Sequence, residues 1–250
     1  MEESEAQKKS FRIVVTGNHD DLDSRFPKEI NGRKCEWLSV PVLSFERLPV
    51  SAGLIDRLIQ KPADWILFTS QRSVQFWAEL LMAHGVELPV ETQVACIGSR
   101  TAEAAKRDGF DPEFYPNDPG TEGFLKHFEK KIASQLAKPS IFIPMAEGGR
   151  PTIRERLAHL GCEVISVSLY RSVPREDIST LITQGTVDLA DAVLFTSPLS
   201  ATAFLKHFRI PPEVRVVSIG RYTFGHLKSV GLDSVKLPQG DFSRIGEVLC

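Results

Sequence analysis

Residues 66–74, with the sequence ILFTSQRSV, return 127 residues later as residues 193–201, VLFTSPLSA. Each copy runs from a short apolar stretch, typical of a buried strand, through Phe-Thr-Ser into a segment that can form a helix. Ser70 and Ser197 stand where a helix N-cap belongs, and Pro198 occupies the favoured first helical position. Both copies therefore predict a strand that leads directly into a helix.

A second pair of stretches supports an internal duplication. Residues 94–101, VACIGSRT, resemble residues 216–223, VVSIGRYT, at an offset of 122. The change from 127 to 122 indicates that the second copy lacks five residues between its helix and its next strand. Deletions at such a loop are well tolerated.

Composition and length fit a globular protein with two domains. The chain has 250 residues, of which 42% are hydrophobic and 25% are charged, and a net charge of −2. This charge gives no general attraction to nucleic acid or to anionic lipid. The first ten residues are polar, and no apolar run approaches the length of a membrane span. We therefore predict a cytoplasmic protein with no nucleic-acid or membrane partner.

The residue types that usually hold metals or cofactors are scattered. The four cysteines form no Cys-x-x-Cys motif, and the six histidines are not at ligand spacing. Neither a Walker loop, nor a Gly-x-Gly-x-x-Gly fingerprint, nor a Gly-x-Ser-x-Gly motif occurs. We expect no metal, no disulfide and no cofactor, and an enzyme here would act by holding and orienting its substrate.

Apolar segments and amphipathic segments alternate along the chain, which predicts parallel α/β sheets covered by helices on both faces. Helices are expected in the gaps between the strands. The expected strands are residues 11–16, 64–69, 94–97, 113–115, 140–143, 163–170, 191–196, 214–219 and 234–237.

The strand count suggests a discontinuous domain. The C-terminal part has only three clear strands, while the strand at 11–16 has no neighbour. We therefore predict one domain from residues 1–40 plus 174–250 and a second, inserted domain from residues 48–168. Residues 37–47 and 167–173 would be linker strands between them. Pro41 argues against a central sheet strand in the run 35–45 and suits an exposed crossing.

Candidate binding residues follow the expected strands. Ligands of parallel α/β sheets bind beyond the carboxyl ends of the strands, here in a cleft expected between the two domains. Taken alone, Ser70 and Ser197 fit helix caps better than ligands, each cap contributing about 1 kcal/mol. The candidates that offer hydroxyls or backbone amides are Thr69, Ser70, Gly98, Ser99, Thr101, Thr196, Ser197, Gly220 and Thr223.

Arginines in the first turn of three expected helices add a signal for an anionic ligand. Arg72, Arg100 and Arg221 are each disfavoured there by the helix dipole, by roughly 0.3–1 kcal/mol. A bound anion would remove this penalty. The alternative is that these arginines are solvated, in which case the helix dipole has a negligible effect on them. Gly149 and Arg150 lie in a glycine turn before another expected helix, which is a further place for an anion.

Taken in order, these motifs resemble the uroporphyrinogen-III synthase family, and the resemblance covers almost the whole chain. It implies two flavodoxin-like parallel-sheet domains joined by a two-stranded linker. The residues that carry it are 40–43 (VPVL), 68–70 (FTS), 97–102 (IGSRTA), Gly149-Arg150 with Leu157 and Gly161, 168–171 (SLYR) and 219–223 (IGRYT).

The resemblance implies a hydro-lyase that cyclises linear hydroxymethylbilane, which bears eight carboxylates, to uroporphyrinogen III. Water leaves, and ring D is inverted through a spiro intermediate without metal or cofactor. The enzyme would be a monomer that receives its substrate from hydroxymethylbilane synthase. Tyr170 would assist departure of the hydroxyl, and Thr101 and Thr223 would bind substrate. Tyr170 could also be a linker aromatic that only packs.

Three positions depart from the family pattern. Gly17-Asn18 stands where arginine-proline is frequent, Gln71 replaces a usual proline, and Phe224 replaces a usual alanine. Two other functions stay open on the residues alone. One is a non-catalytic two-domain binder or sensor of an anionic small molecule, and the other is a flavodoxin-like flavin binder.

Overall fold

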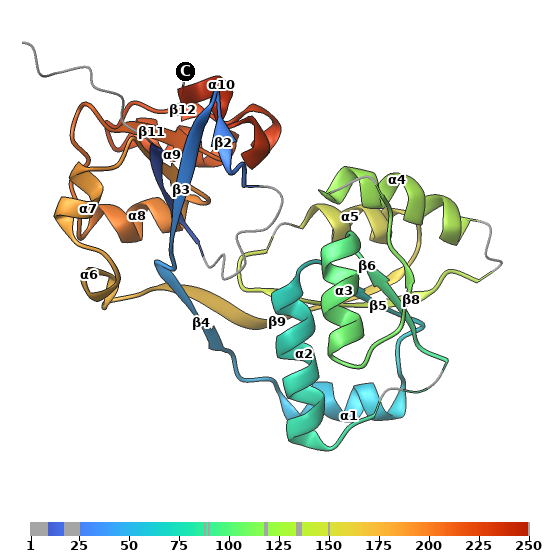
Figure 1. Ribbon diagram of the computed structural model, residues 1–250. Helices are drawn as coiled ribbons and strands as arrows, with labels where there is room; N and C mark the ends of the chain where they lie inside the picture. Colours follow the sequence, from blue (N-terminus) through green and yellow to red (C-terminus); the bar gives the residue numbers. More distant parts are fainter. Residues whose placement is uncertain are drawn as a thin grey trace, which may run out of the picture. The chain divides into compact units, whose positions relative to one another are not determined.

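The protein, described by a computed structural model, forms two compact units (Figure 1). Residues 10–17, 26–87, 89, 91–117, 120–133, 137–149 and 151–249 are described. Unit 1 comprises Met1–Ser44 and Val173–Cys250, whereas unit 2 is the continuous segment Phe45–Ser172. One unit is therefore assembled from both ends of the chain, and the other from its middle.

Unit 1 contains a mainly parallel sheet in the strand order β12-β11-β10-β1-β3-β2. All neighbouring strands are parallel except β2 and β3, which are antiparallel. Its strand β1 pairs with β10, so a strand near the start of the chain lies beside one near the end. The strands are β1 (Ser10–Thr16), β2 (Glu29–Ile30), β3 (Arg33–Val40), β10 (Ala192–Phe195), β11 (Arg215–Ser218) and β12 (Val235–Lys236).

Helical segments cover both faces of this sheet. Successive residues of a strand point to opposite faces, so Val14 packs in one apolar cluster with Phe204, while Ile13 packs in another with Phe242. All four residues of β10 are buried, as expected for a central parallel strand. The helices are α6 (Ile178–Leu181), α7 (Gln184–Asp188), α8 (Pro198–Leu205), α9 (Arg221–Ser229), α10 (Gly246–Leu249), η1 (Pro238–Gly240) and η2 (Phe242–Arg244).

Unit 2 repeats this architecture with the strand order β4-β9-β8-β5-β6-β7. The described pairings of β5, β6, β7, β8 and β9 are all parallel. The predicted fold class, with two mainly parallel α/β sheets, is thus confirmed. The strands are β4 (Leu43–Arg47), β5 (Trp65–Phe68), β6 (Gln93–Cys96), β7 (Pro112–Phe114), β8 (Ser140–Ala146) and β9 (Glu163–Pro174).

Two apolar clusters flank the sheet of unit 2. Phe68 and Trp77 belong to the cluster under α2 and α3, whereas Leu67, Phe124 and Phe128 belong to the cluster under α4 and α5. The sheet is therefore a buried middle layer. The helices are α1 (Ala52–Gln60), α2 (Gln71–His84), α3 (Ser99–Arg107), α4 (Gly120–Ala133) and α5 (Thr152–His159).

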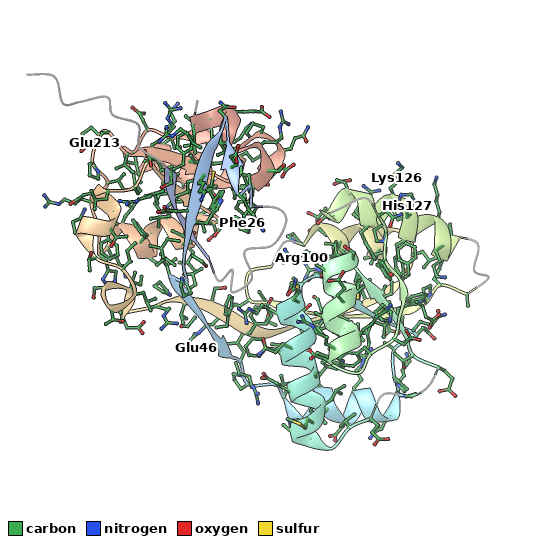
Figure 2. All side chains as sticks on the ribbon, viewed as in Figure 1. Phe26, Glu46, Arg100, Lys126, His127 and Glu213 are labelled. Carbon is green, nitrogen blue, oxygen red and sulfur yellow. The ribbon has the colours of Figure 1, made fainter. Side chains whose placement is uncertain are left out.

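Strands β4 and β9 form a two-stranded ladder where the chain passes between the units. The N–H of Leu48 donates to the carbonyl of Leu169 at 2.8 Å, and the N–H of Arg175 donates to the carbonyl of Val42 at 3.0 Å. Residue numbers rise along β4 while those of its partners on β9 fall, which is the antiparallel pattern. Glu46, labelled in Figure 2, accepts two hydrogen bonds from the Arg171 guanidinium across this ladder.

The interpretation of residues 35–40 as an exposed crossing was wrong. Strand β3 pairs with β1 along seven positions, from Ser10 opposite Lys34 to Thr16 opposite Val40. Pro41 follows the last of these pairs, so its missing N–H costs no hydrogen bond of the ladder. Among the described residues, no helix combines the length and the apolar character needed to cross a membrane.

Candidate functional site

The repeated Phe-Thr-Ser motifs both end in a capping box. The Ser70 hydroxyl accepts the N–H of Ser73 at 3.0 Å, and the Ser73 hydroxyl accepts the N–H of Ser70 at 3.1 Å. Ser197 and Ser200 repeat this exchange at 3.0 and 2.9 Å. The prediction that both serines cap helices is confirmed, because each satisfies backbone donors that the helix leaves without partners.

In unit 2 the capping hydroxyl has a further partner. The phenol oxygen of Tyr170, on β9, lies 3.1 Å from Ser70 Oγ. The ring of Tyr170 stacks on Phe76 with centroids 4.7 Å apart and planes at 10°, and it meets Phe45 edge-on at 6.1 Å. Only 5% of Tyr170 is exposed. Packing therefore fixes the ring and leaves its hydroxyl at the end of the sheet, where it forms the Ser70–Tyr170 pair.

Burial makes this phenol harder to ionise. Loss of solvation raises the pKa of Tyr170 above its ordinary value of 10, and the Ser70 hydrogen bond and the charge of Arg72 oppose this effect only in part. Arg72 places its guanidinium carbon 4.2 Å from the centre of the Phe45 ring, a cation–π contact. At neutral pH the Tyr170 hydroxyl can therefore donate a hydrogen bond.

A cavity of about 320 Å³ opens beside this pair, entirely within unit 2. It lies where β5, β6 and β8 reach their carboxyl ends, beside Tyr170 of β9, which is the usual ligand position in such sheets. Ile97, Ile143 and Met145 supply apolar wall. The hydroxyl-bearing residues that line it are Thr69, Ser70, Thr121, Thr152 and Tyr170. We call it the first cavity.

A tight turn fixes one wall of the first cavity against Tyr170. The N–H of Glu147 donates to the carbonyl of Tyr170 at 2.7 Å, and the N–H of Gly149 donates to the carbonyl of Ala146 at 3.1 Å. A Cβ on Gly149 would lie 2.3 Å from Met145 Cε and 3.0 Å from the Ala146 carbonyl oxygen. A side chain at Gly149 would therefore displace the end of Met145 and press on the Ala146 carbonyl.

The predicted residues around α3 do not line the first cavity. Gly98 is the N-cap of α3 without a side-chain hydrogen bond, and Ser99 is the first helical residue. Figure 2 marks Arg100 in that first turn. Thr101 is only 5% exposed, so its hydroxyl faces protein more than solvent. Arg150 lies outside the described residues.

The other predicted residues belong to unit 1. Thr196 donates its hydroxyl to the carbonyl of Thr16, and Gly220 caps α9. Arg221 reaches the hydroxyl of Tyr222 at 2.8 Å and packs over that ring. Thr223 is buried, with 3% exposed. These residues follow β10 and β11, which are neighbouring parallel strands, so they share one edge of the unit 1 sheet.

Sequence reasoning missed Thr121, Thr152 and Arg154, all of which line the first cavity. Thr121 and Thr152 lie in the first turns of α4 and α5, each of which follows a strand. The rule that selected Thr69 and Ser70 would have found them had it been applied to every strand. Arg154 carries no such signal, because its place depends on how α5 docks.

Other chemistry is sparse in the described part of the chain. It holds no group of three or more histidine, cysteine, aspartate or glutamate side chains placed to bind a metal ion. Cys35, Cys96 and Cys162 are free thiols. Burial raises the pKa of the Cys96 thiol to about 12, which leaves it unreactive at neutral pH.

Comparisons with known proteins converge on one family. Residues 24–240 match the family model described as Uroporphyrinogen-III synthase HemD. A uroporphyrinogen-III synthase from Synechococcus elongatus is 25% identical over 165 residues, which cover 64% of this chain and 61% of that protein.

Solved structures show the same fold. The uroporphyrinogen-III synthetase of Helicobacter pylori superimposes with a TM-score of 0.59 at 17% identity, covering 95% of this chain and 97% of the other. A mutant uroporphyrinogen III synthase from Thermus thermophilus gives a TM-score of 0.51 at 19% identity, with 96% of each chain covered.

Proposed function

The chain belongs to the uroporphyrinogen-III synthase family, and from this membership we propose how the Ser70–Tyr170 pair and the first cavity serve the reaction of that family. The reaction converts linear hydroxymethylbilane to uroporphyrinogen III, with loss of water and inversion of ring D through a spiro intermediate. The enzyme is a lyase. The observation that carries the proposal is a buried, neutral phenol held on a serine hydroxyl at the carboxyl end of a parallel sheet.

Tyr170 acts on the leaving hydroxyl. Its O–H transfers its proton to the oxygen of the terminal hydroxymethyl group, while the pyrrole nitrogen lone pair expels that oxygen as water and leaves an azafulvene cation and a transient phenolate. Help of this kind contributes about 10²–10⁴-fold in rate. The Ser70 hydroxyl donates to the phenol oxygen as negative charge builds there. Tyr170 regains its proton at the end of the closure, when ring D loses one.

Substrate shape decides which isomer forms. Ring D must be attacked at its substituted carbon. The closure is intramolecular, and a cavity that fixes the two ends of the chain holds them in the orientation of this attack. We assign Thr69, Ser70 and Gly149 to the reacting end, because they line the first cavity with Tyr170. Backbone amides at helix N-termini suit the carboxylates of the substrate. The further substrate-binding residues that we propose are Gly98, Ser99, Arg100, Thr101, Arg150, Thr196, Ser197, Gly220, Arg221 and Thr223.

The chemistry of the substrate also supports a supplier and a compartment. Hydroxymethylbilane closes spontaneously to the type I isomer, so a cyclase must meet it soon after it is made. We propose that hydroxymethylbilane synthase hands it over in the cytoplasm. The buried free thiols Cys96 and Cys162 suit a reducing compartment. We propose a monomer as the working form.

The test is the identity of the product. Purified protein is mixed with freshly made hydroxymethylbilane, and the porphyrin isomers are separated after oxidation. We expect type III to replace the type I isomer that forms without protein. Binding of the bilane with type I as the sole product would contradict the proposal, and would identify a binder or sensor of anionic small molecules.

A further inference from the structure

A second cavity, of about 280 Å³, adjoins the first and is also confined to unit 2. Four residues line both cavities, namely Met145, Ala146, Gly149 and Arg154, which shows that the two share a wall. Ser166 and Ser168 of β9 line only the second cavity. Ser166 and Ser168 alternate with Ile165 and Val167, which pack in the same apolar cluster as Tyr170. The pairing register shifts between Ser168 and Tyr170, so the serines face the α5 side of the sheet and the Tyr170 ring faces the other side.

Arg154 is the only charged residue among the described residues that line either cavity. Its side chain is exposed and has no ion-pair or hydrogen-bond partner in the described part of the chain. Arg156, two residues further along α5, differs in this respect, because its guanidinium bonds Glu129 at 2.8 Å. The positive charge of Arg154 thus lines the two cavities, and their other polar groups are hydroxyls and backbone groups.

The turn at 146–149 connects this charge to the Ser70–Tyr170 pair. Ala146 and Gly149 line both cavities, and the N–H of Glu147 holds the carbonyl of Tyr170 at 2.7 Å. A group bound in the second cavity would therefore rest against the segment that positions the Tyr170 backbone. If that group belongs to the substrate, the covalent structure of the substrate fixes its distance from the hydroxymethyl carbon.

We propose that the second cavity is a subsite for one carboxylate of the substrate, with Arg154 as its anchor and Ser166 and Ser168 as hydroxyl donors. The guanidinium fork matches a carboxylate with two parallel hydrogen bonds, and each acetate or propionate arm of the bilane ends in such a group. Arg154 is a positioning residue, since it holds the substrate and does not touch the hydroxymethyl group. This inference rests on the proposed function.

The first experiment compares Arg154→Gln with the matched control Arg156→Gln. Loss of a charged hydrogen-bond partner should raise KM for hydroxymethylbilane roughly tenfold or more in Arg154→Gln. The product should remain type III, because Tyr170 and Ser70 are intact. Arg156→Gln should keep the KM of the unaltered protein. Arg154→Lys, which retains the charge without the fork, should lie between the two. An unchanged KM in Arg154→Gln would overturn the proposal.

The second experiment asks which carboxylate is bound. Hydroxymethylbilanes that each lack one acetate or propionate carboxylate are tested against the unaltered protein and Arg154→Gln. The substitution should weaken binding of every analogue except the one that lacks the partner of Arg154. An equal loss for all analogues would show that Arg154 acts only through its overall charge, and the subsite would be abandoned.

Equilibrium binding separates this inference from the proposed function. Uroporphyrin III, the oxidised form of the product, is titrated into the unaltered protein, Arg154→Gln and Arg156→Gln without any turnover. If the unaltered protein forms no type III product but Arg154→Gln alone binds uroporphyrin III more weakly, the proposed function fails and the carboxylate subsite stands. If type III forms and all three proteins bind equally, the subsite fails alone.

Discussion

The two units carry the same capped motif, but its surroundings differ. In unit 1, Thr16 lies 3.2 Å from the carbonyl oxygen of Leu194 and 3.1 Å from Ser200 Oγ, and it accepts the N–H of Thr196 at 3.2 Å. Hydrogen bonds between residues of unit 1 therefore close the carboxyl end of its sheet at Thr16. In unit 2 the corresponding place is open, and the Ser70 hydroxyl instead meets Tyr170 beside the first cavity.

The strand registers explain this difference. Thr16 lies opposite Val40 in unit 1, and Pro144 lies opposite Val167 in unit 2. Proline has no hydroxyl and cannot make the bonds that Thr16 makes. Three residues beyond these valines stand Leu43 and Tyr170, so a phenol occurs in only one copy. Both copies of the motif keep the capping box. The changes from Thr16 to Pro144 and from Leu43 to Tyr170 in the neighbouring strands account for the open carboxyl end of the sheet in unit 2.

The largest expected difference between the units is in autonomous folding. Residues 45–172 expressed alone should unfold cooperatively, because all strands from β5 to β8 lie within them. Residues 173–250 alone should stay unfolded, since β10 loses its partner β1 and exposes an apolar edge. Circular dichroism during heating distinguishes the two outcomes. A cooperative transition in the 173–250 fragment would show that β1 is dispensable for unit 1.

The next largest effect should come from Tyr170→Phe. The ring and its stacking on Phe76 remain, while the hydrogen-bond donor is lost. We expect kcat to fall about a hundredfold, within the range for acid assistance, while the product stays type III. Unchanged turnover would make Tyr170 a packing residue, and a return to type I would mean that the tyrosine controls the substrate conformation.

The pH dependence follows from the raised pKa of Tyr170. The phenol stays protonated beyond its ordinary pKa of 10, so activity that depends on it should not decline with alkali below that pH. For the same reason, burial of the neutral phenol stabilises the fold fully below pH 10, and this contribution is lost as the pH rises through the folded pKa. A decline of kcat that begins near neutrality and is absent in Tyr170→Phe would contradict this assignment.

Thr16→Val should destabilise unit 1 by about 2 kcal/mol, the usual cost of leaving a buried donor without an acceptor. The substitution keeps the shape of the side chain but removes the acceptor of the Thr196 N–H. Denaturant unfolding of the whole chain measures the effect. Pro144→Ala in unit 2 is the control, since Pro144 makes no such side-chain bond, and a loss as large there would mean that strand packing dominates at both positions.

Local features could be predicted from the sequence, whereas contacts between distant segments could not. Ser70, Ser197 and Pro198 identified two helix starts correctly, because a cap depends only on its next three residues. Residues 35–40 were misjudged, since their pairing with β1 depends on sheet assembly and not on the neighbouring Pro41. The Ser70–Tyr170 contact joins residues 100 positions apart. Both residues were predicted site residues, but the contact between them depends on the order of β5, β8 and β9 in the sheet.

The smallest difference should separate Ser70→Ala from Ser197→Ala. Both remove an equivalent cap, so each should lower the free energy of unfolding by about 1 kcal/mol. Only Ser70 bonds the phenol, and that bond lowers the pKa of Tyr170. Ser70→Ala should therefore raise this pKa further and reduce kcat, while Ser197→Ala leaves the titration of the phenol unchanged. The tyrosinate absorbance, corrected with Tyr170→Phe, measures the titration. Equal curves for both variants would show that the Ser70 hydroxyl is a cap alone, and that the two copies of the motif differ only in the space beside them.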